Sequence, residues 1–496
     1  MLLLVALTAA PLWIPGALLL AQLQPRFRLP TPLLPLAAIA ASGLLGYAVF
    51  WCYFWGPAVG RAASFGLLAA SALALVLPVG RRRLRALATG ELRVVWIAIA
   101  CSAFAATNLH LGVVRDPVGP HWSWAGHAVT SRLFVAPDNQ IPLVFAERLF
   151  EGAELRARIF RDQASERPPL QTGIVLIQYP LWRGLAALGA ARPLTDACYQ
   201  VLGTLLQLTW MAAAWALLRL LGFGRRASGG VLLALVPSYF LYLNSVYVWP
   251  KLLAGGLVVG AYCLLLQRPP GAPLPPARML AAAGLAALGL LAHGGVATAL
   301  LGFGLVLLLP RWFPGAANLL RGALVGVALL APWLAYQCLY DPPANFLLKN
   351  HLAGVLQEDD RSTLQALRDS YAGFTPRSYL ELKLRTLRMV LGIDRQQVPI
   401  YDLPSALRSL RRYQTNQLVP ALGVLNLGWP VVLFALWRGP PESRARWRGL
   451  ARALAVGLLC TGVWMVVQLS LPALQHASYA TLILLFVALA AALVSL

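Results

Sequence analysis

Long apolar stretches recur along the chain and are separated by short polar connections. One helix needs about 20 apolar residues to cross a bilayer core of about 30 Å. The segment 279–309 forms either one long helix or two short ones around His293-Gly294-Gly295. The pattern predicts an all-α polytopic membrane protein with about 13 transmembrane helices. The other expected spans are roughly 2–22, 32–56, 64–80, 92–111, 170–188, 199–221, 229–249, 251–267, 320–340, 418–437, 450–470 and 476–496.

Two connections, 112–169 and 341–417, are too long to be simple linkers, and long loops in compact proteins are usually functional. In the first, 122–134 and 141–160 place apolar residues at helical spacing opposite Arg and Glu, which is typical of helices lying on a membrane surface. The second contains helical patterns near 378–391 and 404–413. The chain thus divides into 1–111, 112–169, 170–340, 341–417 and 418–496.

Charge indicates the topology of the spans. The chain has 41 Lys and Arg against 18 Asp and Glu, and 59% of its residues are hydrophobic. In a soluble protein this balance would favour nucleic acid, but here most arginines lie in short loops beside apolar runs, so no nucleic-acid partner is expected. The basic loops 81–93 and 438–449 are predicted to face the cytoplasm, and both long loops the other side. Counting crossings leaves one odd helix: either 279–309 crosses once, or 170–188 is shallow or re-entrant.

Several kinds of site are excluded by missing patterns. The six cysteines show no CxxC pair and no metal-ligand spacing. The phosphate-binding GxxxxGK[ST], HExxH, GxSxG and dinucleotide motifs are also missing. No ATP hydrolysis is therefore expected, and a reaction here would depend on an activated donor.

The first long loop opens and closes with candidate catalytic groups. Asp116 lies a few residues beyond the fourth span, at the membrane surface, where partial desolvation raises a carboxyl pKa towards that of a general base. A loop aspartate satisfying the turn before Pro117 is the structural alternative. At the other end, Glu166 and Arg167 precede Pro168, Pro169 and Leu170, and the two prolines fix the direction of the acid and the base. An interfacial ion pair at a helix start is the alternative there.

These features resemble the GT-C class of membrane glycosyltransferases, especially the protein O-mannosyltransferases and the lipid A aminoarabinose transferases. The resemblance rests on a first large loop that opens with an acid, closes with Glu-Arg-Pro-Pro-Leu, and is followed by a second large loop. It implies that Asp116 is the catalytic base and that Glu166 and Arg167 lie beside the donor phosphate. Asp116 is followed by Pro117 where the family commonly has a second acid, so Asp138 is the reserve candidate and a divalent metal is left open.

Lys251 interrupts an apolar region directly after Tyr247, Trp249 and Pro250. Charged residues at such positions usually face a cavity or a polar partner, and a lipid-linked phosphate would suit a lysine. A lysine snorkelling to the interface is the alternative. His293, Lys349 and His351 are further candidates for the cavity or the acceptor site.

The expected function is transfer of a sugar from a polyprenyl-phosphate donor to an envelope lipid, glycan or protein, with membrane lipid around the enzyme. By this interpretation the chain lies in a bacterial cytoplasmic (inner) membrane, with its active site facing the periplasm. A lipid or small-anion transporter is the alternative, with Lys251 as its midplane charge. Transporters often show paired broken helices, and the sequence shows no such pairing.

Overall fold

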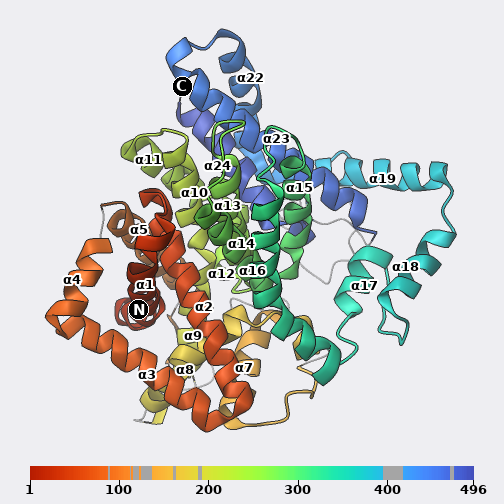
Figure 1. Cartoon of the computed structure of the whole chain (residues 1–496). Coiled ribbons are helices and arrows are strands. Elements are labelled where there is room, and N and C mark those ends of the chain that lie inside the picture. The colour runs from red at the N-terminus through yellow and green to blue at the C-terminus, as the bar shows by residue number, and fades with distance from the viewer. Residues whose placement is uncertain are drawn as a thin grey trace.

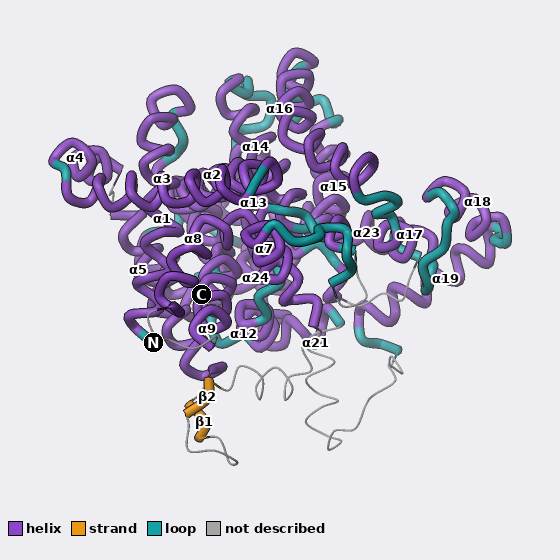
Figure 2. Tube along the Cα trace, turned by 90° about the horizontal axis from the view of Figure 1, so that it is seen from below, coloured by secondary structure: helices purple, strands orange, loops and turns teal. Residues whose placement is uncertain are grey.

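The computed structural model describes residues 1–87, 90–111, 113–115, 122–124, 137–159, 163–187, 193–394, 417–469 and 474–495. Helices dominate this part of the chain, which confirms the expected all-α membrane class (Figure 1). Within it the strands are β1 (Val113–Arg115) and β2 (Trp122–Trp124), which pair antiparallel with Arg115 opposite Trp122 (Figure 2). The helix expected from residue 122 is therefore wrong at 122–124, where the backbone forms a strand ladder.

The helices follow the apolar stretches closely. Proline at the first turn, where a missing N–H costs nothing, starts several of them. They are α1 (Leu2–Phe27), α2 (Leu34–Trp55), α3 (Pro57–Val76), α4 (Pro78–Leu87), α5 (Gly90–Leu111), α7 (Ile141–Glu151), α8 (Leu170–Ala187), α9 (Pro193–Gln207), α10 (Thr209–Leu220), α11 (Arg225–Leu235), α12 (Tyr239–Val246), α13 (Lys251–Leu266), α14 (Pro276–Ala292), α15 (Ala297–Leu307), α16 (Ala316–Ala335), α17 (Phe346–Ala353), α18 (Thr363–Ala372), α19 (Pro376–Leu391), α21 (Leu418–Leu422), α22 (Gly428–Arg438), α23 (Arg444–Val467) and α24 (Tyr479–Val494).

Eight helical segments of the described chain are long and apolar enough to cross a membrane, and a ninth results if α11 and α12 are joined. Four shorter apolar helices, Lys251–Leu266, Pro276–Ala292, Gly294–Leu307 and Tyr479–Val494, complete the bundle. The expected count of 13 is not confirmed. The span expected at 229–249 is bent, because α11 and α12 meet at an angle of 78° around Pro237.

The segment 279–309 is a helical hairpin. Helix α14 ends at Ala292, a short 3-10 turn, η4 (Gly294–Val296), follows His293, and α15 returns. The two outer ends of the hairpin meet, because Arg268 donates to the Trp312 carbonyl (2.7 Å) and the Gly271 N–H to the Arg311 carbonyl (2.8 Å). This segment therefore passes inward and back.

Helix α8 is the odd helix in the count of crossings. It begins beside Gly43 in the middle of α2 and runs in the same direction as α2, so that Gly173 packs on the backbone of Gly46. A side chain at Gly173 would collide with the Gly46 carbonyl oxygen, so glycine permits this close approach. The hairpin and this parallel start together favour a re-entrant α8.

The two long loops contact each other. The Arg158 guanidinium forms an ion pair with Glu358, and Glu166 Oε1 accepts the Leu347 N–H at 3.1 Å. Ser165 Oγ also donates to the Asp341 carbonyl at 3.3 Å. Both loops therefore lie on the same side of the helix bundle, as expected from the arginine distribution.

The basic loops gather at the other end of the bundle. Glu91, beside the arginines of α4, pairs with Arg219 and Arg225 at 3.2 Å. The Arg446 guanidinium lies over the Phe223 ring at 5.1 Å, which brings the second basic loop to the same place. Helix α13 runs from one end of the bundle to the other. It begins with Lys251, on the side of the long loops. At its other end the Leu266 carbonyl accepts a hydrogen bond from Arg452 (2.9 Å).

The helical expectations for the long loops hold in part. Helix α7 confirms the start of the segment 141–160, but the helix ends at Gly152, whose φ of 72° is left-handed. Helix α19 confirms the stretch 378–391, and Thr375 caps it in a reciprocal capping box with Ser378. The stretch 404–413 lies outside the described residues.

Candidate active site

Arg167 and Lys251 share one aromatic side chain. The Lys251 Nζ lies 4.2 Å from the centre of the Trp249 ring, and the Arg167 guanidinium carbon lies 5.2 Å from it. Lys251 begins α13 and is 7% exposed, whereas Arg167 and Trp249 are half-buried. Cations favour the face of an indole, most strongly where water is scarce. Two residues predicted to bind one phosphate therefore lie in one site.

Aromatic rings surround these two cations. The Tyr479 ring, at the start of α24, lies 5.4 Å from Lys251 Nζ, and its hydroxyl donates to Asn244 Oδ1 at 2.7 Å. The Tyr247 ring lies 5.7 Å from that of Trp249. Of the two predicted aromatic neighbours, Trp249 thus contacts Lys251, and Tyr247 packs against Trp249. Such rings can carry a sugar or an apolar chain on their faces.

Three histidines extend the site. The His293 ring packs edge-on against Trp249 at 5.6 Å, and its Nδ1 accepts the Gly295 N–H at 3.0 Å. His351 of α17 lies 5.2 Å from His476, ring centre to ring centre. The His351 carbonyl also accepts the Leu469 N–H at 2.8 Å, which ties α17 to the end of α23. His293 and His351 were predicted to line the cavity.

His351 and His476 lie outside the membrane-spanning helices, and both have a depressed pKa. Burial lowers the pKa of His351, and the charges of Lys251 and Arg167 lower it further. Burial also lowers the pKa of His476, followed by Lys251 and His351. Both imidazoles are therefore neutral at pH 7, and the positive charge of the site resides on Lys251 and Arg167.

The site is recessed into the bundle. Helices α13, α15 and α24 begin at or next to the cluster, with α15 preceded by η4, and α14 ends there at His293. These four apolar helices have 10–17 residues, fewer than the roughly 20 that span a bilayer core. The ends of these four helices at the cluster therefore lie deeper in the bundle than the ends of the longer helices. Three of these ends are helix N-termini, whose partial positive charge favours an anion.

Glu166 joins the two long loops at this site. It is 8% exposed in the short turn η3 (Ala164–Glu166), and its Oε1 accepts the N–H of Leu347 in the first turn of α17. An acceptor at a helix N-terminus satisfies a donor that the helix itself cannot. Glu166 therefore holds the second loop, and with it His351, over the cluster.

Lys349 lies on the same helix as His351 but serves the loop. Its Nζ donates to Asp359 Oδ1 (2.7 Å) and to the carbonyls of Asp359 (2.7 Å) and Arg361 (3.0 Å). These three bonds use all the donors of one ammonium. The structure thus brings His351, and not Lys349, to the cluster.

Asp116 lies outside the described residues, directly after β1. Asp138 belongs by its backbone to the turn η2 (Pro137–Gln140), and its side chain is likewise outside what the structure describes. Among the described side chains no three His, Cys, Asp or Glu residues come together as metal ligands.

His476 and Tyr479 were not predicted. Both stand at the beginning of the stretch that reads as the last span, where neither interrupts the apolar pattern. A histidine directly before an apolar helix was the one available signal. No family model, no curated protein and no solved structure matches this chain.

Proposed function

We propose that this chain is a membrane glycosyltransferase of GT-C type that uses a polyprenyl-phosphate sugar. The observation that carries the proposal is the placement of Arg167 and Lys251 against one Trp249 ring in a recessed site. Two fixed cations at helix N-termini form a strong site for a phosphate. Because the site lies among apolar helices, a phosphate carried by a lipid suits it better than a free one.

An apolar cavity also favours a lipid-linked donor. About 530 Å³ in volume, it is lined by aromatic and apolar side chains of α2, α16 and the π-helical turn η5 (Tyr336–Tyr340). Gln337 of that turn donates to the Ser165 carbonyl (2.7 Å), next to Glu166, so the cavity adjoins the site. Trp55 at its edge is 78% exposed. An isoprenoid tail entering from the bilayer would find an apolar surface here. The lining residues are Trp51, Phe54, Trp55, Pro332, Ala335, Tyr336 and Tyr340.

The reaction we propose is displacement at the anomeric carbon. The acceptor hydroxyl or amine attacks this carbon, and its proton passes to Asp116. The bond from this carbon to the phosphate oxygen breaks, and its electron pair stays on the phosphate. Lys251 and Arg167 stabilise the charge that develops on the leaving phosphate, and such preorganised cations are usually the largest catalytic term. The envelope lipid, glycan or protein acceptor would enter at the face of the two long loops. We propose that this face lies on the periplasmic side of a bacterial inner membrane.

A transporter of a lipid or small anion is the second candidate. It is favoured by two helix breaks, between α11 and α12 and between α14 and α15, because transporters bind substrates at broken helices. Against it, Glu166 and Arg158 tie both long loops together over the recessed site. Alternating access requires that such a site open in turn to each side.

Reconstituted protein incubated with radiolabelled polyprenyl-phosphate sugars tests both functions. If the protein transfers sugar, the radiolabel should become attached to the acceptor when donor and acceptor are both supplied on the outside of the vesicles. Transport predicts unchanged donor that has moved to the lumen. The variant Lys251→Ala should abolish transfer, and Lys383→Ala is a matched control. Lys383 also lies over an aromatic ring, that of Tyr379 at 5.0 Å, but it belongs to α19. Translocation without covalent transfer would overturn the enzyme assignment.

A further inference from the structure

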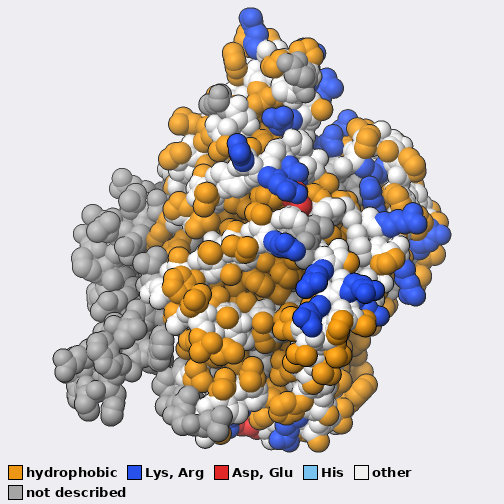
Figure 3. Space-filling view, turned by 90° about the vertical axis from the view of Figure 1, so that its left-hand side faces the viewer, with side chains coloured by type: hydrophobic (Ala, Val, Ile, Leu, Met, Phe, Trp, Pro, Cys, Tyr) orange, Lys and Arg blue, Asp and Glu red, His pale blue; other side chains and the backbone are white. Residues whose placement is uncertain are grey.

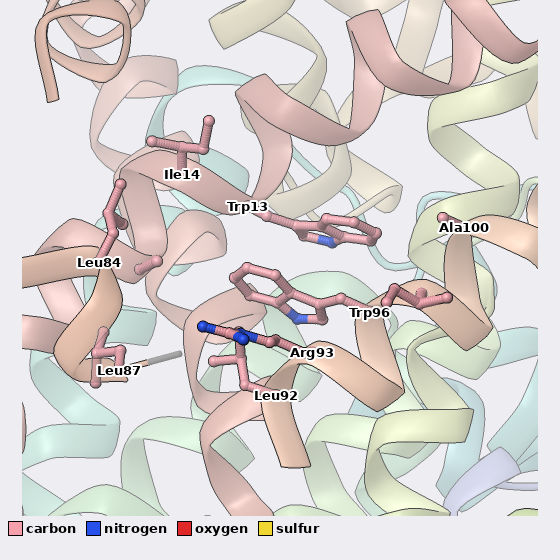
Figure 4. A pocket seen from close by; sticks show the side chains of 10 residues that line it. Trp13, Ile14, Leu84, Leu87, Leu92, Arg93, Trp96 and Ala100 are labelled. Atoms are coloured by element: carbon pink, nitrogen blue, oxygen red, sulfur yellow. The ribbon is translucent and has the colours of Figure 1, made fainter. Parts of the chain in front are cut away.

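Another concave surface lies at the basic end of the bundle, between α1, α4 and α5 (Figure 4). Its volume is about 380 Å³, and almost all of its lining is apolar. Trp13 and Trp96 form its wall, with ring centres 5.0 Å apart and planes inclined by 15°. Leu84 and Leu87 of α4 close the opposite side. We refer to this surface as the α1–α4–α5 groove.

Arginine surrounds the groove. Arg93 lines it, and α4 adds Arg81, Arg82, Arg83 and Arg85, all exposed. Figure 3 shows the side of the molecule that carries α4, where blue basic side chains gather and red acidic ones are scarce. One arginine therefore lines the groove, and four more lie on a helix that forms one of its sides.

The helices that line the groove contain almost no acid. Helix α1 contains no acid, and the segment 78–100 contains one, Glu91. The Glu91 side chain is 4% exposed and turns into the bundle, where it meets Arg219 and Arg225 at 3.2 Å and accepts from the Trp215 indole. The arginines at the groove therefore keep a strong attraction for an external anion.

The groove combines an apolar lining with a cationic rim. A phospholipid has the matching pattern, with acyl chains beside a phosphate, and basic pockets between membrane helices select anionic headgroups. A soluble anion would not use the apolar lining, and a neutral lipid would not use the arginines.

We infer that the α1–α4–α5 groove binds one anionic glycerophospholipid, with an acyl chain on Trp13 and Trp96 and the phosphate at Arg93 and α4. This site is separate from the Lys251 cluster and does not depend on the proposed enzyme function. It lies at the end of the bundle where Glu91 meets Arg219 and Arg225, opposite the two long loops. The lipid would stabilise the otherwise exposed helix α4 against α1 and α5.

The test uses the full chain, purified in neutral detergent and stripped of lipid. Phosphatidylglycerol, phosphatidylcholine with the same acyl chains, or inorganic phosphate is added, and native mass spectrometry and thermal unfolding record binding. We expect one retained phosphatidylglycerol and a raised Tm, with neither effect from phosphatidylcholine or phosphate. Arg93→Gln should weaken retention about fivefold, as for the loss of one basic side chain at an anionic lipid. Ala100→Phe, which fills the groove from α5, should abolish it.

Arg444→Gln is the matched control, because Arg444 is an exposed arginine of the other basic loop. It should retain phosphatidylglycerol like the unmodified chain. Equal loss in Arg444→Gln and Arg93→Gln would overturn the inference in favour of diffuse charge attraction. Equal stabilisation by phosphatidylcholine, or by phosphate alone, would overturn it in favour of a nonspecific apolar surface or a free-anion site.

Discussion

The Arg167 guanidinium carbon and the Lys251 ammonium lie 5.2 Å and 4.2 Å from the centre of the same Trp249 indole. The first residue closes a long loop and the second begins a helix of the central bundle. Trp249 is thus one aromatic side chain that both cations contact. Two like charges at one ring would be stabilised by a bound anion, and this is the basis of the proposed phosphate site.

The first prediction concerns this pair. Lys251→Ala and Arg167→Ala should each weaken binding of polyprenyl phosphate by about 2 kcal/mol or more, as for truncation of one partner of a desolvated charge pair. The double variant should lose less than the sum of the two single losses, because both groups share one ligand. Binding to the purified protein without any sugar measures these values.

A matched variant controls for general damage. Lys383 also lies over an aromatic ring, that of Tyr379 (5.0 Å). Lys383→Ala should leave the affinity for polyprenyl phosphate as it is. If instead both site variants bind normally, Arg167 and Lys251 are interfacial anchors and the donor binds elsewhere.

The second prediction concerns the catalytic carboxylate. Asp116→Asn keeps the shape of the side chain and removes its charge, so sugar transfer should fall roughly 10²-fold or more, in line with the loss of a general base. Expression and donor binding should stay normal, which separates this variant from Lys251→Ala. Full activity of Asp116→Asn together with an inactive Asp138→Asn would move the base to Asp138.

The third prediction concerns topology. Because Arg158 pairs with Glu358 across the two long loops, cysteines placed on either loop must give the same result. In a cysteine-free background Ala153→Cys and Asp360→Cys should react with an impermeant maleimide in intact cells, whereas Ala86→Cys on α4 should not. All three positions are exposed in the protein. Labelling of Ala86→Cys alone would place the candidate site in the cytoplasm and contradict the proposed donor.

Hydropathy predicted most of the helices, because the backbone N–H and C=O groups of an apolar stretch in a membrane must hydrogen-bond to each other. Breaks within the stretches depend on packing and were harder to foresee. Pro237 marks the bend between α11 and α12, yet a proline inside an apolar run also occurs in the continuous helix α8, at Pro180. The packing of α8 along α2 depends on the contact between Gly46 and Gly173, which no local pattern reveals.

The candidate site divides in the same way. Lys251 and Arg167 were found because each breaks a local rule, as a lysine within apolar sequence and as an arginine held by two prolines. His476 breaks none, and only the fold places it 5.2 Å from His351. Lys349 has the right chemistry but is satisfied by Asp359, ten residues further on, and this pairing required the turn of the second loop to be known.

The last prediction concerns pH. An unperturbed histidine has a pKa of about 6.5, and burial together with nearby cations lowers the pKa of His351 and His476 in the folded protein. Below pH 6.5 the unfolded chain therefore binds more protons at these residues than the folded chain does. Their contribution to stability is complete above pH 6.5 and is lost as the pH falls towards the folded pKa values, about 4 for His351 and about 3 for His476.

Thermal unfolding of the purified protein between pH 7.5 and pH 5 measures this effect. The Tm should fall with decreasing pH, and His351→Gln and His476→Gln should each make the fall shallower, because glutamine does not titrate. The Tm of the double variant should depend least on pH, because each substitution removes one titrating group from the pair of neighbouring rings. A pH dependence identical in all four proteins would mean that both imidazoles have the same pKa in the folded and unfolded states. The cations at Trp249 would then be too well screened to act on them.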